Sequence, residues 1–275
     1  MTMKELLQIA LDLTNLETMP EDSGAIYDNG REIKKVLAGI DMTTAELHIA
    51  KQAGFDCVAV HHPIGIQNPN IGELFGRDHM KKMMECGVPI NVAQKIAYAR
   101  KERSHQGSHS RNKGLYPDMA KLLDINALAL HTPADMLAEF YVQKRMDRIY
   151  EENPRLTVQD VIDELMTIRE YQEALEGQQP EVWVGSKTSF AGRIYVEMYG
   201  VGAPSLEEYI ACSDAGIGTF VCMHATPEVL EGMKKHNKSN IVVAGHMASD
   251  SLGFNQILKV WEEKGVEVVR VSGLI

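Results

Sequence analysis

The chain contains 275 residues with a mass of 30.6 kDa, of which 44% are hydrophobic and 24% charged, a composition typical of a globular protein with a sizeable core. Its formal net charge of −10 argues against general nucleic-acid binding, because contact with phosphates depends on Lys and Arg. The sequence shows no signal peptide and no apolar run near the roughly 18 residues of a membrane span, so we expect a cytoplasmic protein without a membrane partner. Its four cysteines form no C-x-x-C pair, and we expect them to be reduced thiols.

The first quarter of the chain predicts a helix, a loop and then a strand–helix–strand unit. Thr43 is suited to cap the helix between the two strands, and Gly54 to end it. A connection of this length allows a right-handed parallel crossover, which places Asp41, at the end of the first strand, at the same sheet edge as the residues after the second strand. The expected ranges are 4–13 for the helix, 15–30 for the loop, and 35–41, 46–53 and 57–60 for the unit.

The second strand of this unit ends at two adjacent histidines and a proline, His61, His62 and Pro63. Pro63 biases His62 toward an extended backbone, so the pair is not wound into a helix. Ligand and metal sites of open α/β sheets lie at this strand edge, and neutral imidazole is the commonest metal ligand in proteins. We therefore interpret His61 and His62 as metal ligands; the alternative is a pair of solvated loop histidines.

A basic segment, residues 98–113, follows a polar loop, a helix and a short strand. It holds five basic residues against one acid, and its two histidines, His105 and His109, stand four positions apart. One interpretation is a solvated surface loop. The other is that one or both histidines reach the metal while the basic side chains attract an anionic substrate.

The middle of the chain is helical almost throughout and predicts an arm between two α/β lobes. We expect an α/β fold with a metal site in the cleft between the lobes, an N-terminal lobe over 1–131, a helical connecting arm over 132–187 and a C-terminal lobe over 188–275. The remaining helices are expected at 73–85, 118–123, 133–178 with a break at 153–154, 205–211, 227–235 and 252–264, and the remaining strands at 89–93, 126–131, 192–198, 218–223, 241–244 and 266–271.

A second candidate site lies near the C-terminus, where an apolar run ends at His246 and Asp250 follows four residues later. If the helix begins here, both side chains lie on one side of its first turn, close enough to share a metal. Asp250 is also an ordinary first-turn acid in the alternative interpretation. His224 follows another apolar run, and we favour a role near the substrate or behind a ligand over direct ligation.

No G-x-G-x-x-G, P-loop or G-x-S-x-G motif indicates a nucleotide cofactor or a serine nucleophile.

With these motifs in view, the chain resembles the NIF-three-like dinuclear-metal family, whose members are often catalogued as type-two GTP cyclohydrolase I. The resemblance is carried by residues 37–43, 56–63 and 244–250, and it spans residues 1–131 and 188–275. It implies two neighbouring metal ions in a cleft between the lobes and a homo-oligomeric ring, usually a hexamer. His61 and His62 match the family's adjacent histidine ligands, and His246 matches its C-terminal histidine. Asp250 stands where the family usually has glutamate.

The larger departure concerns a central motif of histidine, three residues and aspartate. Its nearest match is residues 105–109, where His109 stands in place of the aspartate. A site richer in histidine than the family's usual one favours zinc, with iron or manganese as further candidates, for one or two divalent ions per chain.

The function that the resemblance and the residues together favour is a metal-dependent hydrolase. Its substrate would be a small phosphorylated or nucleotide-like molecule attacked by metal-activated water, with Asp41 or His224 as proton acceptor. The alternative is a metal-binding regulatory or scaffold protein without turnover. No residue of the sequence selects guanine, so the substrate stays open.

Overall fold

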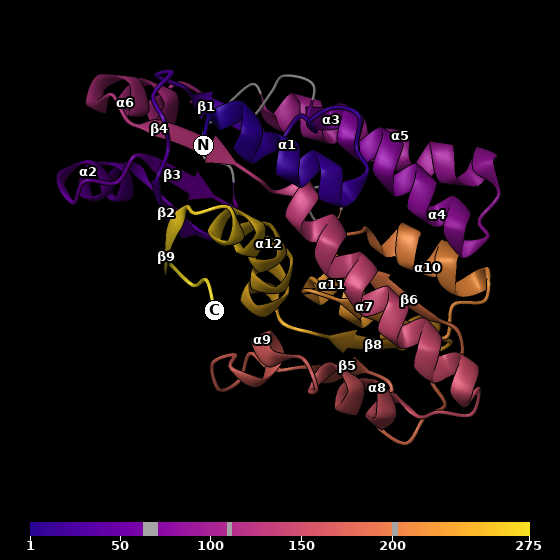
Figure 1. Cartoon of the computed structure of the whole chain (residues 1–275). Coiled ribbons are helices and arrows are strands. Elements are labelled where there is room, and N and C mark those ends of the chain that lie inside the picture. Colours follow the sequence, from indigo (N-terminus) through magenta and orange to yellow (C-terminus); the bar gives the residue numbers. More distant parts are fainter. Residues whose placement is uncertain (63–70, 109–111, 200–202) are drawn as a thin grey trace. The chain divides into compact units, whose positions relative to one another are not determined.

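The computed structural model describes residues 1–62, 71–108, 112–199 and 203–275 of an α/β protein (Figure 1). The chain divides into two compact units. Unit 1 comprises Met1–Ile71, His105–Leu137 and Asp250–Ile275, and unit 2 comprises Gly72–Ser104 and Ala138–Ser249. Each unit contains its own β-sheet. The sequence predicts continuous segments with boundaries at 131 and 187. Both units are discontinuous, because Gly72–Ser104 belongs to unit 2 and the last strand of the chain returns to the sheet of unit 1.

The sheet of unit 1 has the strand order β1-β4-β3-β2-β9, with all neighbours parallel except β1 and β4 (Figure 1). The predicted strand–helix–strand unit and its parallel pairing are confirmed. The stretch expected as a loop contains β1, and the last strand pairs with β2. The strands are β1 (Gly24–Tyr27), β2 (Lys35–Gly39), β3 (Cys57–Val60), β4 (Asn126–Ala129) and β9 (Glu267–Val271).

Helices cover both faces of this sheet, as expected for parallel strands that are buried on both sides. Successive residues of β3 alternate between two cores: Cys57 and Ala59 pack with α1 (Met3–Thr14) and α12 (His246–Glu263), and Val58 and Val60 pack with α2 (Thr44–Gln52) and α6 (Leu115–Leu123). The α2 helix begins at the predicted cap, where Thr43 and Glu46 form a capping box.

The sheet of unit 2 has the order β5-β8-β7-β6, and only β5 is antiparallel to its neighbour. At the β6 edge, the amide of Gln143 takes the place of a further strand: its Nε2 donates to Ile194 O at 3.3 Å, and its Oε1 accepts from Val196 N at 2.7 Å. The remaining strands are β5 (Glu181–Val184), β6 (Ile194–Glu197), β7 (Thr219–Cys222) and β8 (Asn240–Val243), and the remaining helices are α3 (Ile71–Leu74), the π-helix η1 (Phe75–His79), α4 (Met80–Cys86), α5 (Ile90–Ser108), α7 (Thr132–Glu152), α8 (Val158–Leu165), α9 (Arg169–Gln172), α10 (Leu206–Asp214) and α11 (Pro227–His236).

The strand expected over 89–93 is wrong, because residues 90–93 form the first turn of α5. Ala93 and Ala97 are both buried in the core of unit 2, and a spacing of four residues places them on one helical face. The segment interpreted as a basic loop is helical as far as Ser108. Strand β5 also lies inside the range expected for the helical arm. Within the described ranges, no helix combines the length and apolar character required to cross a bilayer.

Candidate metal centre

Four strand ends of unit 1 meet at one edge of its sheet. The last residues of β2, β3 and β4 are in register, Gly39 beside Val60 and Val60 beside Ala129, and the antiparallel β1 begins at the same edge, with Gly24 beside Ala129. Polar side chains follow or precede each of these ends within two residues: Asp41 after β2, His61 and His62 after β3, His131 after β4, and Asp22 before β1. The sheet topology therefore gathers them from distant parts of the sequence.

At this edge, the histidines lie beside two buried carboxylates, Asp135 in the first turn of α7 and Asp250 on α12. His61 Nε2 is 3.3 Å from Asp135 Oδ1 and 3.5 Å from Asp250 Oδ1, and His62 Nε2 is 3.3 Å from Asp250 Oδ2. The ring centroids of His61 and His131 are 5.0 Å apart. His61, His62 and His131 form one group that could hold an ion, and His61, Asp135 and Asp250 form another, with ligand atoms within 4.8 Å of one another in each.

All three imidazoles are oriented through their Nδ1 atoms. His61 Nδ1 donates to the backbone oxygen of Leu130 at 3.0 Å, His62 Nδ1 to Asp41 Oδ1 at 3.0 Å, and His131 Nδ1 to an oxygen of Asp22 at 2.8 Å. Because these oxygens can only accept, the proton of a neutral ring lies on Nδ1 and the Nε2 lone pair is left for a ligand. This is the usual arrangement of metal-ligating histidines and their outer partners.

The carboxylates of the cluster favour positive charge at its histidines. Burial lowers the pKa of His61, but the carboxylates of Asp250 and Asp135 outweigh it and raise that pKa well above its usual value. Burial likewise lowers the pKa of His131, and Asp135 and Asp22 raise it further than burial lowers it. His61 Nε2 and Asp135 Oδ1 are both buried, and neither makes a well-directed hydrogen bond to the described residues. A mixed nitrogen and oxygen donor set of this kind fits a divalent ion such as zinc.

The structure brings four of the eight predicted site residues together in unit 1: Asp41, His61, His62 and Asp250. Two others belong to unit 2, where the ring of His224 lies 4.6 Å from that of His246, the first residue of α12. His105 is exposed on α5 and is in none of the groups that the described residues form, and His109 lies outside the described residues. The roles assigned to these eight residues stay predictions.

Three residues of the cluster, Asp22, His131 and Asp135, are not among the residues predicted from the sequence. A signal for two of them was present: β4 ends just before His131, and Asp135 follows four residues later, the same pattern that singled out His246 and Asp250. His131 and Asp135 have the spacing of the central motif for which the nearest match in the sequence had been placed at 105–109. Asp22 carried no such signal, because the segment around it was interpreted as a loop.

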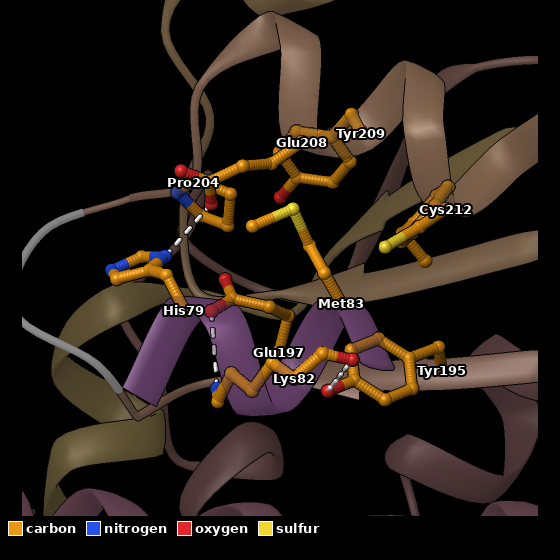
Figure 2. Close-up of a pocket in the computed structure, with 10 residues that line it drawn as sticks. His79, Lys82, Met83, Tyr195, Glu197, Pro204, Glu208, Tyr209 and Cys212 are labelled. Atoms are coloured by element: carbon orange, nitrogen blue, oxygen red, sulfur yellow. Dashed lines mark hydrogen bonds and ion pairs between the residues drawn. The ribbon is translucent and has the colours of Figure 1, made fainter. Parts of the chain in front are cut away.

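A second buried cluster of charged side chains lies in unit 2, around a small cavity of about 20 Å³ (Figure 2). Lys82 Nζ is 2.7 Å from Glu139 Oε2 and 3.1 Å from Glu197 Oε1. Glu208 accepts from His79 Nδ1 at 2.7 Å, and its other oxygen accepts from Arg100 at 3.1 Å. A cavity of this size holds a water molecule, and each of the three carboxylates already has a basic side chain as its partner. We interpret this cluster as structural.

No protein-family model and no curated protein matches the chain. Among solved structures, a NIF3 superfamily protein from Sphaerobacter thermophilus is 35% identical over 98% of both chains, with a TM-score of 0.92. The reduced form of HcgD from Methanocaldococcus jannaschii is 14% identical over 98% of this chain and 97% of its own, with a TM-score of 0.61. TTHA1606 from Thermus thermophilus is 17% identical over 99% of this chain and 98% of its own, with a TM-score of 0.55. These last two share the fold alone, but the first match establishes that the chain belongs to the NIF3 superfamily.

Proposed function

We propose that this protein is a metal-dependent hydrolase that acts on a small phosphorylated or nucleotide-like substrate. The observation that carries the proposal is the set of three imidazoles, each fixed at Nδ1 by an oxygen and each directed with Nε2 toward buried carboxylates. A divalent ion, zinc in our proposal, would lower the pKa of a water molecule and polarise the scissile group.

Some residues of the cluster would bind the ion, and another would transfer a proton. His61, Asp135 and Asp250 are buried and would hold the ion in a place that bulk water does not reach. Asp41 lies at the open side, since 63% of its side chain is exposed, and it is hydrogen-bonded to His62. It could therefore pass a proton between the site and solvent. The role of His246 as a ligand, two ions per chain and a hexameric ring follow from the family. The place of His224 near the substrate follows from its position after an apolar run. All four remain part of the proposal.

A specific observation favours the second candidate function, a metal-binding regulatory or scaffold protein without turnover. Two of the bases expected to attract an anionic substrate are already neutralised within unit 2. Arg100 is 3.1 Å from Glu208, and Lys101 is 2.6 Å from Glu73. Less of the basic segment is thus left to bind a phosphate than its sequence suggests.

The experiment that tests the metal centre is elemental analysis of protein purified without chelator. We expect one to two equivalents of divalent metal per chain in the wild type and a loss of metal in His61→Ala and His62→Ala. His48→Ala is the matched control, because His48 is an exposed histidine on α2 that is outside the cluster. Wild-type metal content in His61→Ala would contradict the assignment.

Turnover separates the two functions. The metal-loaded protein is incubated with a panel of phosphoesters and nucleotides, alongside His61→Ala and the His48→Ala control. Hydrolysis that needs His61 supports the enzyme. Hydrolysis that persists unchanged in His61→Ala contradicts a metal-dependent mechanism, and metal binding without turnover across the panel favours the regulatory protein.

A further inference from the structure

Asp22 is a fully buried carboxylate directly behind His131. It lies two residues before β1, with an exposed fraction of 0%. One of its oxygens accepts from His131 Nδ1 at 2.8 Å and from Thr132 Oγ1 at 2.7 Å, and the other accepts from Ser23 Oγ at 3.0 Å. Ser23 Oγ also accepts the backbone N–H of His131 at 3.0 Å. Asp22 and Ser23 therefore hold both the backbone and the ring of one histidine.

Burying an ionised carboxylate is costly unless its partners compensate for the lost water. Both oxygens of Asp22 accept hydrogen bonds from side-chain donors, so the carboxylate acts as an acceptor toward all three of them. Of its three side-chain donors, two are neutral hydroxyls, and His131 is the one that can carry charge.

We propose that Asp22 is a positioning residue that fixes His131 in the tautomer with its proton on Nδ1 and so presents the Nε2 lone pair to a divalent ion. This inference deepens the proposed metal centre and rests on it. A carboxylate cannot donate a proton to Nδ1, so the opposite tautomer would leave two acceptors facing each other in a buried site. That tautomer would also place a hydrogen on Nε2, toward Asp135, where a ligand atom is needed.

The pair formed by Asp41 and His62 provides an internal comparison. Its hydrogen bond is 3.0 Å, but 63% of the Asp41 side chain is exposed, against 1% of the Asp22 side chain. Water can replace the carboxylate as acceptor at the exposed position but not at the buried one. We therefore expect removal of the Asp22 carboxylate to affect metal binding more strongly than removal of the Asp41 carboxylate.

The experiment measures zinc affinity by competition with a chelator in wild type, Asp22→Ala, Asp41→Ala and the surface control Asp12→Ala, which lies on the exposed side of α1. Loss of an outer partner of a metal-ligating histidine typically weakens binding about 10- to 100-fold, and we expect this for Asp22→Ala. Asp41→Ala should lose less than about tenfold, and Asp12→Ala should bind as the wild type does. Asp22→Asn keeps an acceptor oxygen and should restore part of the affinity.

The second readout needs no metal and would not respond to a merely structural role. Long-range ¹H–¹⁵N spectra of the metal-free protein, taken to alkaline pH until the ring is neutral, report which nitrogen of His131 carries the proton. We expect Nδ1–H in the wild type and a mixture of tautomers in Asp22→Ala. If Asp22→Ala does not fold, Thr132→Val, which removes one donor from the carboxylate, is measured in its place and should weaken zinc binding less than severalfold while keeping the Nδ1–H tautomer.

Two results would overturn the inference: zinc affinity in Asp22→Ala within about threefold of the wild type, or an Nε2–H ring in the wild-type protein. Absence of hydrolysis by the wild type bears on the proposed enzyme alone, because neither zinc affinity nor the tautomer depends on turnover. A wild type that binds no zinc would remove the metal centre itself, and the inference with it.

Discussion

Replacement of Lys82 by methionine tests whether the buried charges of unit 2 hold its elements together. Lys82 on α4 bridges Glu139 of α7 and Glu197 of β6 at 2.7 and 3.1 Å, and the three side chains are 4%, 8% and 10% exposed. Burial lowers the pKa of Lys82, but the two carboxylates raise it further than burial lowers it, so the ammonium stays charged. Methionine has a similar volume and no charge, so Lys82→Met leaves two buried carboxylates without their common cation.

The size of the effect follows from that geometry. Removing one partner of a buried ion pair costs about 3–5 kcal/mol, because the remaining charge is left uncompensated. The backbone N–H groups of Met198 and Tyr199 still donate to Glu139, which places our expectation near the lower end of that range. At about 2–4 °C per kcal/mol for a chain of this size, Tm should fall by roughly 6–12 °C.

The assay is urea unfolding, with hydrogen exchange to locate the loss in α4, α7 and β6. Lys81→Met is the matched control: the neighbouring lysine is 60% exposed and lies 3.8 Å from Glu85, and exposed pairs contribute about 1 kcal/mol at most. Adding Glu197→Gln to Lys82→Met should recover part of the stability, since it removes one of the two unpaired charges. A loss smaller than that of an exposed pair, or an equal loss in Lys81→Met, would refute the reasoning.

Three further predictions concern acid stability, a backbone constraint and the metal. Burial raises the pKa of Glu208, but its histidine and arginine partners lower it below the usual 4.5. The stability that the carboxylate adds is present above pH 4.5 and is lost as the pH falls through the folded pKa, so the urea midpoints of wild type and Glu208→Gln should converge as the pH falls below 4.5; parallel profiles would contradict this. Gly245 has φ +105°, and a Cβ at this position would overlap the backbone oxygen of Gln178. Gly265 has a similar φ of +90° but open space around it, so Gly245→Ala should lower Tm more than Gly265→Ala. Equal losses of Tm in the two variants would count against the overlap. A divalent ion at about 100 times its Kd should add about 2.7 kcal/mol to the free energy of unfolding, and an unchanged Tm after chelation would argue against a bound ion.

Local sequence patterns determined much of unit 1 and the place of three residues of its site, Asp41, His61 and His62. Thr43 and Glu46 fix the start of α2 through their own hydrogen bonds, and the apolar run of β3 stops at His61 and His62 wherever the strand is placed. The position of Asp41 at the same edge followed from the length of the connection between two parallel strands. Caps, apolar periods and connection lengths involve residues close in sequence, so they can be predicted without the fold.

Only the tertiary structure decided the rest of the cluster. The pairing of β4 with β3 brings His131 beside His61, and the antiparallel pairing of β1 with β4 brings Asp22 behind His131, although the two residues are 109 positions apart in the chain. The pairing of β9 with β2 likewise draws the C-terminal segment into unit 1. Which strands become neighbours depends on how the whole apolar surface is buried, and no local pattern in this sequence carries that information.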